Sequence, residues 1–202
     1  SWSVSAITLF SGSNDITVTV TDGAGNTRTD MITITYSNII PSGSIRINSG
    51  AVYTKSTNVT LNLSATDDAG VTGYYLSTSS TVPAATAPGW TAVTSTASYS
   101  ANVSYTLVSG DGVKTIYVWY KDGSGNVSGT ASDTITLDTT APSVTITSPT
   151  SNTTYSTTSS TVSLGGTASD ITSGVGSVTW SNSGGGSGTA SGTTSWSVSA
   201  IP

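Results

Sequence analysis

The sequence predicts an all-β protein built from two-sheet sandwiches in series. Three observations support this fold class: segments in which apolar and polar residues alternate, tight turns that recur in nearly the same form, and a composition poor in helix-forming residues. Alternation with a period of two residues directs apolar side chains to one face of a strand. Thr, Ser and Gly are abundant whereas Glu and Gln are absent, which favours strands and turns over helices.

Two segments show the alternation most clearly. Residues 15–22 (DITVTVTD) and residues 115–122 (TIYVWYKD) lie 100 positions apart, and both carry apolar residues at every second position. Because alternate side chains of a strand point to opposite faces, one face of each segment is predicted to pack on a core. The predicted inward residues are Ile16, Val18 and Val20 in the first segment and Ile116, Val118 and Tyr120 in the second.

Each of these strands leads into the same kind of turn and then into a closing strand. The turns read DGAGN at 22–26 and DGSGN at 122–126. Asp and Asn bond to the local backbone in such turns, and Gly accepts positive φ. Closing strands are predicted at 30–36 and 133–138. The inward residues of the first closing strand are Ile32 and Ile34.

A second pattern also occurs twice, and its order is Pro, strand, Tyr, strand, Asp-rich turn, strand. It begins at Pro41 and again at Pro142. The first copy is followed by the strand-turn-strand pattern of residues 115–138, whereas the second runs only to Pro202. The second copy therefore predicts a sandwich that still needs strands. Its inward residues are predicted to be Val162, Leu164, Val178 and Trp180.

The first seven residues, SWSVSAI, occur again at 195–201, an offset of 195 − 1 = 194 positions. Both copies are predicted to form a strand that belongs to the same slot of a sandwich. The sequence leaves open which copy fills that slot. The residues that mark this overlapping strand are Trp2, Val4, Trp196 and Val198.

These alignments predict one complete module flanked by two half-modules. Residues 1–38 would form a C-terminal half, residues 39–138 a complete module, and residues 139–202 an N-terminal half. TTAP at 139–142 is predicted to be a short, stiff linker, because Pro restricts itself and the residue before it. The N-terminal half is expected to be completed by residues 1–36 of the next unit.

Two long segments carry a family resemblance. PSGSIRINSGAVYTKSTNVTLNLSATDDAGV and SGDGVKTIYVWYKDGSGNVSGTASDTITLDTTAP resemble the tandem immunoglobulin-like or fibronectin-III-like modules of large bacterial surface and secreted proteins. PSVTITSPT and ITVTVTDGAGNT resemble a sister module of the same group. The resemblance covers essentially the whole chain and implies immunoglobulin-like β-sandwiches in series. It implies a stalk, an adhesin spacer or an appendage of a secreted enzyme, and the fold alone does not choose among them.

Half-modules are expected to associate with copies of the same chain. A half-sandwich exposes strand edges that template pairing with another chain. The five inward residues of the 15–36 hairpin are together worth about 8–15 kcal/mol when buried, which is comparable to the stability of a whole domain. We therefore expect head-to-tail pairing between units by strand addition. The alternative is a covalent tandem array in which this chain is one repeat.

Composition excludes several functions. The net charge is −5 with five Lys and Arg residues, too few for the basic stripe that nucleic-acid binding needs. No run of about 18 apolar residues exists, so no membrane span is predicted. The chain contains no His, Cys or Glu for acid–base or nucleophilic catalysis. We therefore predict that the chain is not an enzyme.

No cofactor is predicted, with calcium as the one candidate ion. Asp67 and Asp68 are adjacent in one predicted turn, and Asp170 takes the corresponding place in the sister module. Calcium takes several oxygen ligands, including carboxylates. The competing interpretation is that these Asp side chains cap turns, and none of them belongs to a DxDxDG loop.

An aromatic pair is the one candidate surface site. Tyr117 and Trp119 take positions predicted to face outward, where the sister strand has Thr17 and Thr19. Such a pair would bind a glycan or pack against a neighbouring strand. The competing interpretation is that segment 78–104 folds over that face and buries the pair.

The sequence thus supports three functional hypotheses. The first is a structural subunit or repeat of an extracellular filament or stalk, assembled head to tail by β-strand complementation. The second is an adhesin repeat that binds a glycan or a surface. The third is a spacer module of a secreted enzyme. All three predict an extracellular or cell-surface location.

Overall fold

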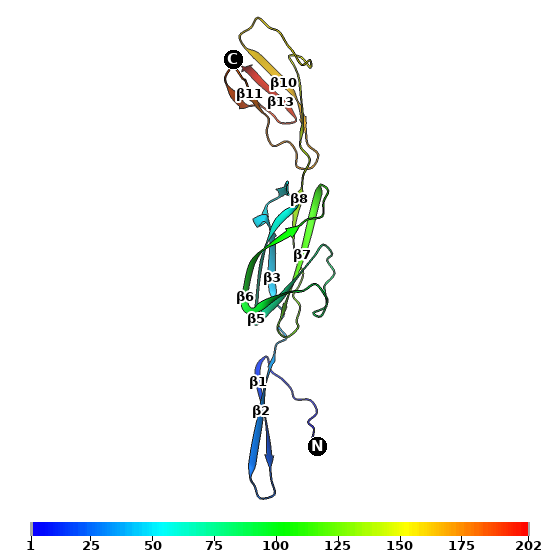
Figure 1. Cartoon of the computed structure of the whole chain (residues 1–202), viewed down its shortest axis with the longest axis vertical. Coiled ribbons are helices and arrows are strands. Elements are labelled where there is room, and N and C mark those ends of the chain that lie inside the picture. Colours follow the sequence, from blue (N-terminus) through cyan, green and yellow to red (C-terminus); the bar gives the residue numbers. More distant parts are fainter. Residues whose placement is uncertain (1, 202) are drawn as a thin grey trace. The chain divides into compact units, whose positions relative to one another are not determined.

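The computed structural model of the chain describes residues 2–201 and confirms the all-β fold class (Figure 1). The helical structure of the described residues is one 3-10 turn, η1 (Asn48–Gly50). The chain divides into two compact units. The first unit holds the residues up to Ala51, Asn58–Thr106 and Thr115–Thr134, and the second holds Val52–Thr57, Leu107–Lys114 and the residues from Ile135 onward.

The first unit contains a long antiparallel hairpin of β1 (Gly12–Thr21) and β2 (Thr27–Tyr36), blue in Figure 1. Ile16 lies directly opposite Ile32. Directly opposed residues share a face of a sheet, and that face continues at every second position. The five residues predicted to face inward therefore share one face of the hairpin. They are Ile16, Val18, Val20, Ile32 and Ile34.

The six strands β3 to β8 are connected in one sheet. Its hydrogen-bonding order is β3-β5-β7-β8-β4, and β6 pairs with β5. Alternate residues of β5 and β7 are buried, as a sandwich core requires. The strands are β3 (Ser42–Ile47), β4 (Tyr53–Thr54), β5 (Asn58–Ser77), β6 (Thr91–Thr106), β7 (Gly112–Asp122) and β8 (Ala131–Leu137).

Strand β5 is much longer than the sequence predicts. It pairs with β3 through residues 61–66 and with β7 through residues 71–77. An Asp-rich turn was expected between these segments, but the chain stays extended with a register shift between Thr66 and Val71. The strand continues because β6 pairs with β5 on both sides of the shift. Gly70 permits the bend: its φ is +85°, and a Cβ there would collide with the Ser95 side chain.

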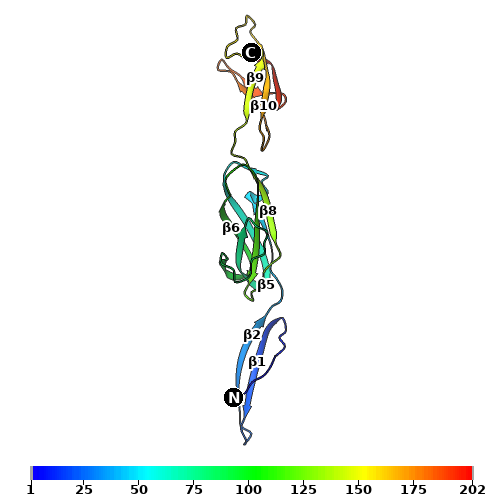
Figure 2. The same ribbon diagram turned by 90° about the vertical axis from the view of Figure 1, so that its right-hand side faces the viewer.

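The second unit contains a three-stranded sheet in the order β13-β10-β9 and the small hairpin β11–β12 (Figure 2). A small core of Ala168, Ala190 and Trp196 lies between them, and Leu164 and Val178 pack against it. The strands are β9 (Ser143–Ser148), β10 (Val162–Ser169), β11 (Thr179–Ser181), β12 (Ser187–Thr189) and β13 (Ser195–Ile201).

The several sheets and the absence of longer helices in residues 2–201 agree with an immunoglobulin-like β-sandwich architecture. The two compact units do not follow the predicted boundaries after residues 38 and 138. One complete module between two half-modules stays a prediction.

Candidate functional site

The β1–β2 and β7–β8 hairpins contain the same turn directly after their first strand. Asp22 Oδ1 accepts a hydrogen bond from the Asn26 backbone N–H at 2.8 Å, and Asp122 Oδ1 accepts one from the Asn126 backbone N–H at 2.7 Å. The side-chain amide of each Asn also donates to Oδ2 of its Asp, at 2.8 and 2.7 Å. The side-chain hydrogen bond from Asn26 is the main reason why the pKa of Asp22 lies below its ordinary value. The recurring turn predicted from the sequence is therefore confirmed.

The two hairpins differ in the burial of their apolar faces. Ile116, Val118 and Tyr120 of β7 are buried, and so are the inward residues of β8. In the β1–β2 hairpin, by contrast, Val20 is 64% exposed and Ile32 is 59% exposed. Val18 is also exposed, while Ile16 and Ile34 are half-buried. The first hairpin thus presents five apolar residues on one face, which Asp30 and Arg28 share opposite Val18 and Val20, and no sheet in residues 2–201 covers it.

The sheet of β9, β10 and β13 also has an apolar face that is only partly covered. Gly166 of β10 lies opposite Trp196 of β13 and Ile146 of β9, so these three positions share a face. Ile146 and its neighbour along the face, Val144, are exposed. Val162, Leu164 and Val198 are half-buried.

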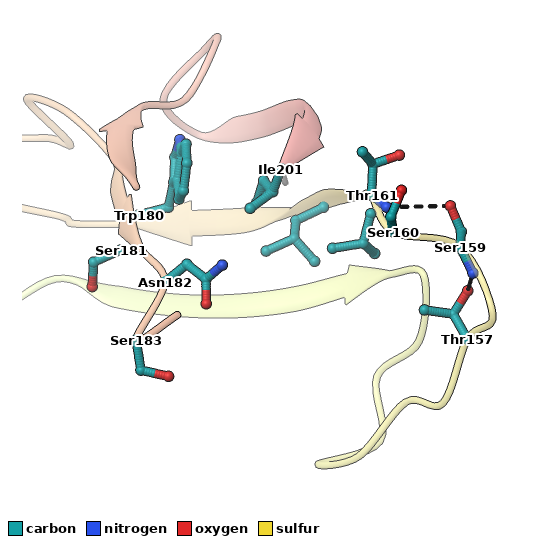
Figure 3. A pocket seen from close by; sticks show the side chains of 11 residues that line it. Thr157, Ser159, Ser160, Thr161, Trp180, Ser181, Asn182, Ser183 and Ile201 are labelled. Carbon is teal, nitrogen blue, oxygen red and sulfur yellow. Dashed lines mark hydrogen bonds between the residues drawn. The ribbon is translucent and has the colours of Figure 1, made fainter. Parts of the chain in front are cut away.

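Two clefts open on this partly covered face. The larger has a volume of about 650 Å³, and the smaller, shown in Figure 3, has a volume of about 390 Å³. Trp180 of β11 and Leu164 of β10 line both clefts, and Ile201 lines the smaller one. The larger cleft is also lined by Val144, Ile146, Val178, Ala190, Trp196 and Val198.

The strand order of this sheet matches part of the larger one. β10 lies between β9 and β13, as β5 lies between β3 and β6. The later part of β5 also pairs with β7. By chain order, β11 is the counterpart of the later part of β5. Among the described residues, β11 pairs with one strand, β12. One edge of β11 therefore lies open where the larger sheet has β7.

The segment around Tyr155 also differs from its counterpart in the larger sheet, β4. Tyr53 and Thr54 form β4, which pairs in parallel with Thr136 and Leu137 of β8. The sequence aligns Tyr155 with Tyr53, but Tyr155 is exposed and lies outside any strand. Among the described residues after the linker, 143–201, no strand is a counterpart of β8, so the segment around Tyr155 has no strand to join.

The strand pattern of the second unit agrees with a comparison to known families. Residues 142–201 match the family model of the bacterial Ig domain. The match spans β9 to β13 and confirms the resemblance to bacterial immunoglobulin-like modules for this segment. A search of curated proteins finds no match to the chain.

The match also bears on activity and location. The bacterial Ig domain is a class of module that is generally not catalytic. Such domains commonly occur in surface proteins. Among residues 2–201, no helix has the length and apolar character that a membrane crossing requires.

The two copies of SWSVSAI have different surroundings. In the segment that matches the family model, residues 142–201 and below called the bacterial Ig domain, β13 contains the second copy. Trp196 is 6% exposed there and Val198 is half-buried. In the first copy, Trp2 is 73% exposed and Val4 is also exposed, and residues 2–7 form no strand. In this chain the slot predicted for the overlapping strand is thus filled by β13.

Gly166 provides the space for Trp196 in that slot. A Cβ at position 166 would collide with the Thr145 carbonyl oxygen and would lie 2.6 Å from the Trp196 ring. We expect Gly166→Ala to destabilise the bacterial Ig domain by about 1–3 kcal/mol, the usual cost of overpacking. Gly165→Ala is the matched control, because a Cβ there meets its nearest atom at an ordinary 3.5 Å. Equal denaturation midpoints, followed by tryptophan fluorescence, would contradict this role of Gly166.

The prediction that Trp119 faces solvent is wrong. Trp119 is fully buried, and its Nε1–H donates to Thr130 Oγ1 at 3.0 Å. Tyr75 contacts it edge-on at 6.2 Å between ring centroids, and Trp90 packs on Tyr75 in turn. The direct cover of Trp119 is therefore Tyr75 of β5, and segment 78–104 adds Trp90 to the same cluster, as the competing interpretation expected. Tyr117 is half-buried and stacks on Trp119, so no exposed aromatic pair is available to a glycan at this place.

The Asp residues considered for calcium do not form one site. Asp67 and Asp68 belong to the first unit and Asp170 to the second. Asp170 Oδ1 accepts hydrogen bonds from three backbone N–H groups, including those of Ser173 and Gly174 at 2.8 Å. It therefore caps a turn, as the competing interpretation expected. In residues 2–201, no three His, Cys, Asp or Glu side chains are placed to hold a metal ion.

Asp67 is the one acidic residue of the three that is buried. Its Oδ1 accepts the Ala69 backbone N–H at 3.0 Å, but its Oδ2 is buried without a hydrogen-bond partner. Burial, and secondly the charges of Asp122 and Asp68, raise the pKa of Asp67. Calcium at Asp67 stays a prediction, and the unpaired Oδ2 is what supports it.

Asp67→Asn is expected to stabilise the protein at pH 7 by about 1 kcal/mol, because it removes a buried charge that Asp122 and Asp68 repel and keeps the bond to Ala69. The pKa of Asp67 is raised on folding, so its favourable contribution is complete below its unfolded pKa and is lost as pH rises through its folded value. The stability gap between variant and wild type should therefore shrink as pH falls towards 4. Thermal melts at pH 4 and pH 7 measure this. A variant less stable than wild type at pH 7 without calcium, or a calcium-dependent rise in wild-type melting temperature that the variant lacks, would show that the carboxylate is needed.

The predicted linker is anchored by a different Asp residue. Asp111 accepts hydrogen bonds from the Thr139 backbone N–H at 2.8 Å and from the hydroxyls of Thr139 and Thr140 at 2.7 and 2.6 Å. These hydrogen bonds, with the Thr140 hydroxyl first, lower the pKa of Asp111 to about 2. Sequence patterns had not singled out Asp111, because its partners lie 28 and 29 residues away.

Proposed function

We propose that this chain is a structural building block of an extracellular filament or stalk, in which the β1–β2 hairpin of one copy completes the bacterial Ig domain of another. One observation carries the proposal. Two hairpins with the same Asp-Gly-x-Gly-Asn turn have their apolar faces buried in β7–β8 and exposed in β1–β2. The exposed hairpin has the form of a core element that lacks its sheet.

The larger sheet of the same chain indicates how the hairpin would dock. In the larger sheet, β7 pairs with the later part of β5. The counterpart of that part of β5 is β11. The incoming β1 would therefore add to the open edge of β11, with β2 beside it. Residues 155–156 would then pair with the incoming β2 as β4 pairs with β8. The apolar face of the hairpin would cover Trp180 and both clefts.

The energy of this contact is large enough to hold two copies together. Full burial of the five apolar residues of the hairpin face is worth about 8–15 kcal/mol, an upper bound because some of these residues are already half-buried. The exposed Val144 and Ile146 would lose solvent contact on the other side. Main-chain hydrogen bonds along β11 would fix the register and the direction of the incoming β1.

The geometry of the contact favours a linear polymer. Each chain carries one exposed hairpin face and one partly covered sheet face, which are different surfaces. A contact between different surfaces is heterologous, so it leaves one free surface of each kind at the two ends of every assembly. Such a polymer grows until it closes on itself or runs out of subunits.

Electron microscopy of the purified chain tests the proposal. We expect linear polymers that dissociate under denaturing conditions to a single band near 20.1 kDa. A folded chain that stays monomeric at concentrations far above 1 µM would contradict the proposal. A band far above 20.1 kDa from native material would instead show that the repeats are joined covalently.

A further inference from the structure

We infer that residues 1–7 of the incoming copy replace β13 of the copy that they join. This inference rests on the proposed function and identifies the strand that accompanies the hairpin. The assembled bacterial Ig domain would then contain β9 to β12 of one chain and residues 1–36 of another. The displaced residues 195–201 would leave the slot in which they lie in the single chain.

The slot accepts either copy because their sequences are identical. Trp196 fills the space above Gly166, and Ile201 lies opposite Val162 and is 6% exposed. In the incoming copy the same side chains are Trp2 and Ile7, which are 73% and 50% exposed. Replacement therefore keeps the side-chain contacts of the slot and buries the incoming pair.

The first copy shares one unusual backbone angle with the second. Ala200 has φ of +53°, and Ala6 has φ of +52°. Positive φ is uncommon for Ala and marks an irregular point of a strand. In β13 this irregularity accompanies a register shift opposite Val162–Leu164 of β10. Residues 2–7 form no strand, but the kink that the slot requires is already present at Ala6.

Chain connectivity favours replacement over retention of β13. In the larger sheet, Leu107 follows β6 directly, is buried, and lies five residues before Gly112, which begins β7. Ile7 lies five residues before Gly12, which begins β1, and both glycines have positive φ. With residues 1–7 in the slot, residues 8–11 would connect slot and hairpin as residues 108–111 do in the larger sheet.

Retention of β13 gives a poorer arrangement. Residues 8–11 would then have to lead away from the slot at once, and Trp2 and Ile7 would stay exposed beside a docked hairpin. Replacement exposes Trp196 and Ile201 instead of Trp2 and Ile7. The free energy of burying these side chains is therefore the same in both arrangements. The difference that remains is the ordered connection between the slot strand and the hairpin, which only the incoming chain supplies.

Disulfide trapping tests the inference, since the chain has no native Cys. Ser197 lies opposite Gly165 and directs its backbone N–H and C=O towards Ser191 instead. It therefore forms a non-hydrogen-bonded pair with Gly165, the kind whose side chains approach most closely. A side chain at position 165 meets only ordinary contacts. The test variant is Gly165→Cys with Ser3→Cys, and the matched control is Gly165→Cys with Ser197→Cys.

The two double variants give opposite expected results. The variant at 165 and 3 should form disulfides between chains, seen as a covalent ladder on a non-reducing denaturing gel of the polymers. The variant at 165 and 197, oxidised as a monomer, should lose polymerisation at least tenfold and recover it on reduction.

Other outcomes separate this inference from the proposed function. Polymers without a ladder, together with normal polymerisation of the oxidised control, would overturn replacement and leave the hairpin contact standing. A wild-type chain that does not polymerise at all would overturn the proposed function and this inference with it.

Discussion

Val18→Asp is expected to abolish self-association while leaving the folded monomer intact. Val18 is already exposed in the single chain, so a carboxylate there costs little before assembly. In the assembly it would be buried directly opposite Asp30, a like charge, and burial of an uncompensated carboxylate costs about 3–5 kcal/mol. That cost weakens each contact by about 150- to 4000-fold. Sedimentation velocity and circular dichroism measure the two effects.

Two control variants test whether the face and the burial of the new charge decide its effect. Thr17→Asp places the same charge on the opposite face of β1 and should leave polymerisation unchanged. Val118→Asp places the charge at the matching position of β7, which is fully buried, and should unfold the larger sheet. Equal loss of assembly in Thr17→Asp and Val18→Asp would show that charge alone, rather than the apolar face, controls association.

Trp119→Ala is expected to give the largest loss of stability of any single truncation in the chain. The side chain is fully buried, donates a hydrogen bond to Thr130 and packs edge-on against Tyr75. Truncation of such a residue costs about 3–5 kcal/mol. Tyr117→Ala is the comparison, because Tyr117 is only half-buried and should cost clearly less. Urea denaturation of the two variants measures the difference.

A small effect of Trp119→Ala would revive the surface interpretation. If stability changed by less than about 1 kcal/mol, within the range of ordinary surface substitutions or little above it, the ring would contribute little to the core. Loss of glycan binding or of lateral filament contacts in that variant would then assign the aromatic pair a binding role.

The hairpins and turns were predictable because their signals are local. Alternation placed Ile16, Val18 and Val20 on one face, and the paired strands agree. The Asp-Gly-x-Gly-Asn motif predicted a turn because Asp and Asn bond to backbone within four residues, as Asp22 and Asp122 do. Such features depend on neighbours in sequence and not on the rest of the fold.

The errors arose where distant segments decide the outcome. Trp119 was predicted to face outward because alternation tells which residues share a face, but not whether a later segment covers it. Lys121 lies over the Trp90 ring and donates to the Ala85 carbonyl oxygen, and both contacts help hold that cover in place. The sequence predicts a turn at the bend in β5 because Asp67, Asp68 and Gly70 are turn formers, whereas pairing with β6 keeps the strand extended.

The sequence predicts which residues line the candidate interface, but it does not predict which copy of SWSVSAI forms the strand beside β10. Trp180 and Leu164 were expected to face inward, and they line two clefts of the bacterial Ig domain. The sequence left open which copy of SWSVSAI occupies its slot, since identical residues carry identical signals. Burial resolves this for the single chain, where Trp196 is buried and Trp2 is exposed.

The most direct test of head-to-tail completion mixes two chains, each disabled on one side. Val18→Asp blocks the hairpin, and Ile146→Asp blocks the cleft at a residue that is exposed in the single chain. Each variant should be monomeric alone, and an equal mixture should give a 1:1 complex of twice 20.1 kDa by sedimentation equilibrium. A mixture that contains only monomers, while wild-type chains polymerise, would contradict the pairing of the hairpin with this cleft.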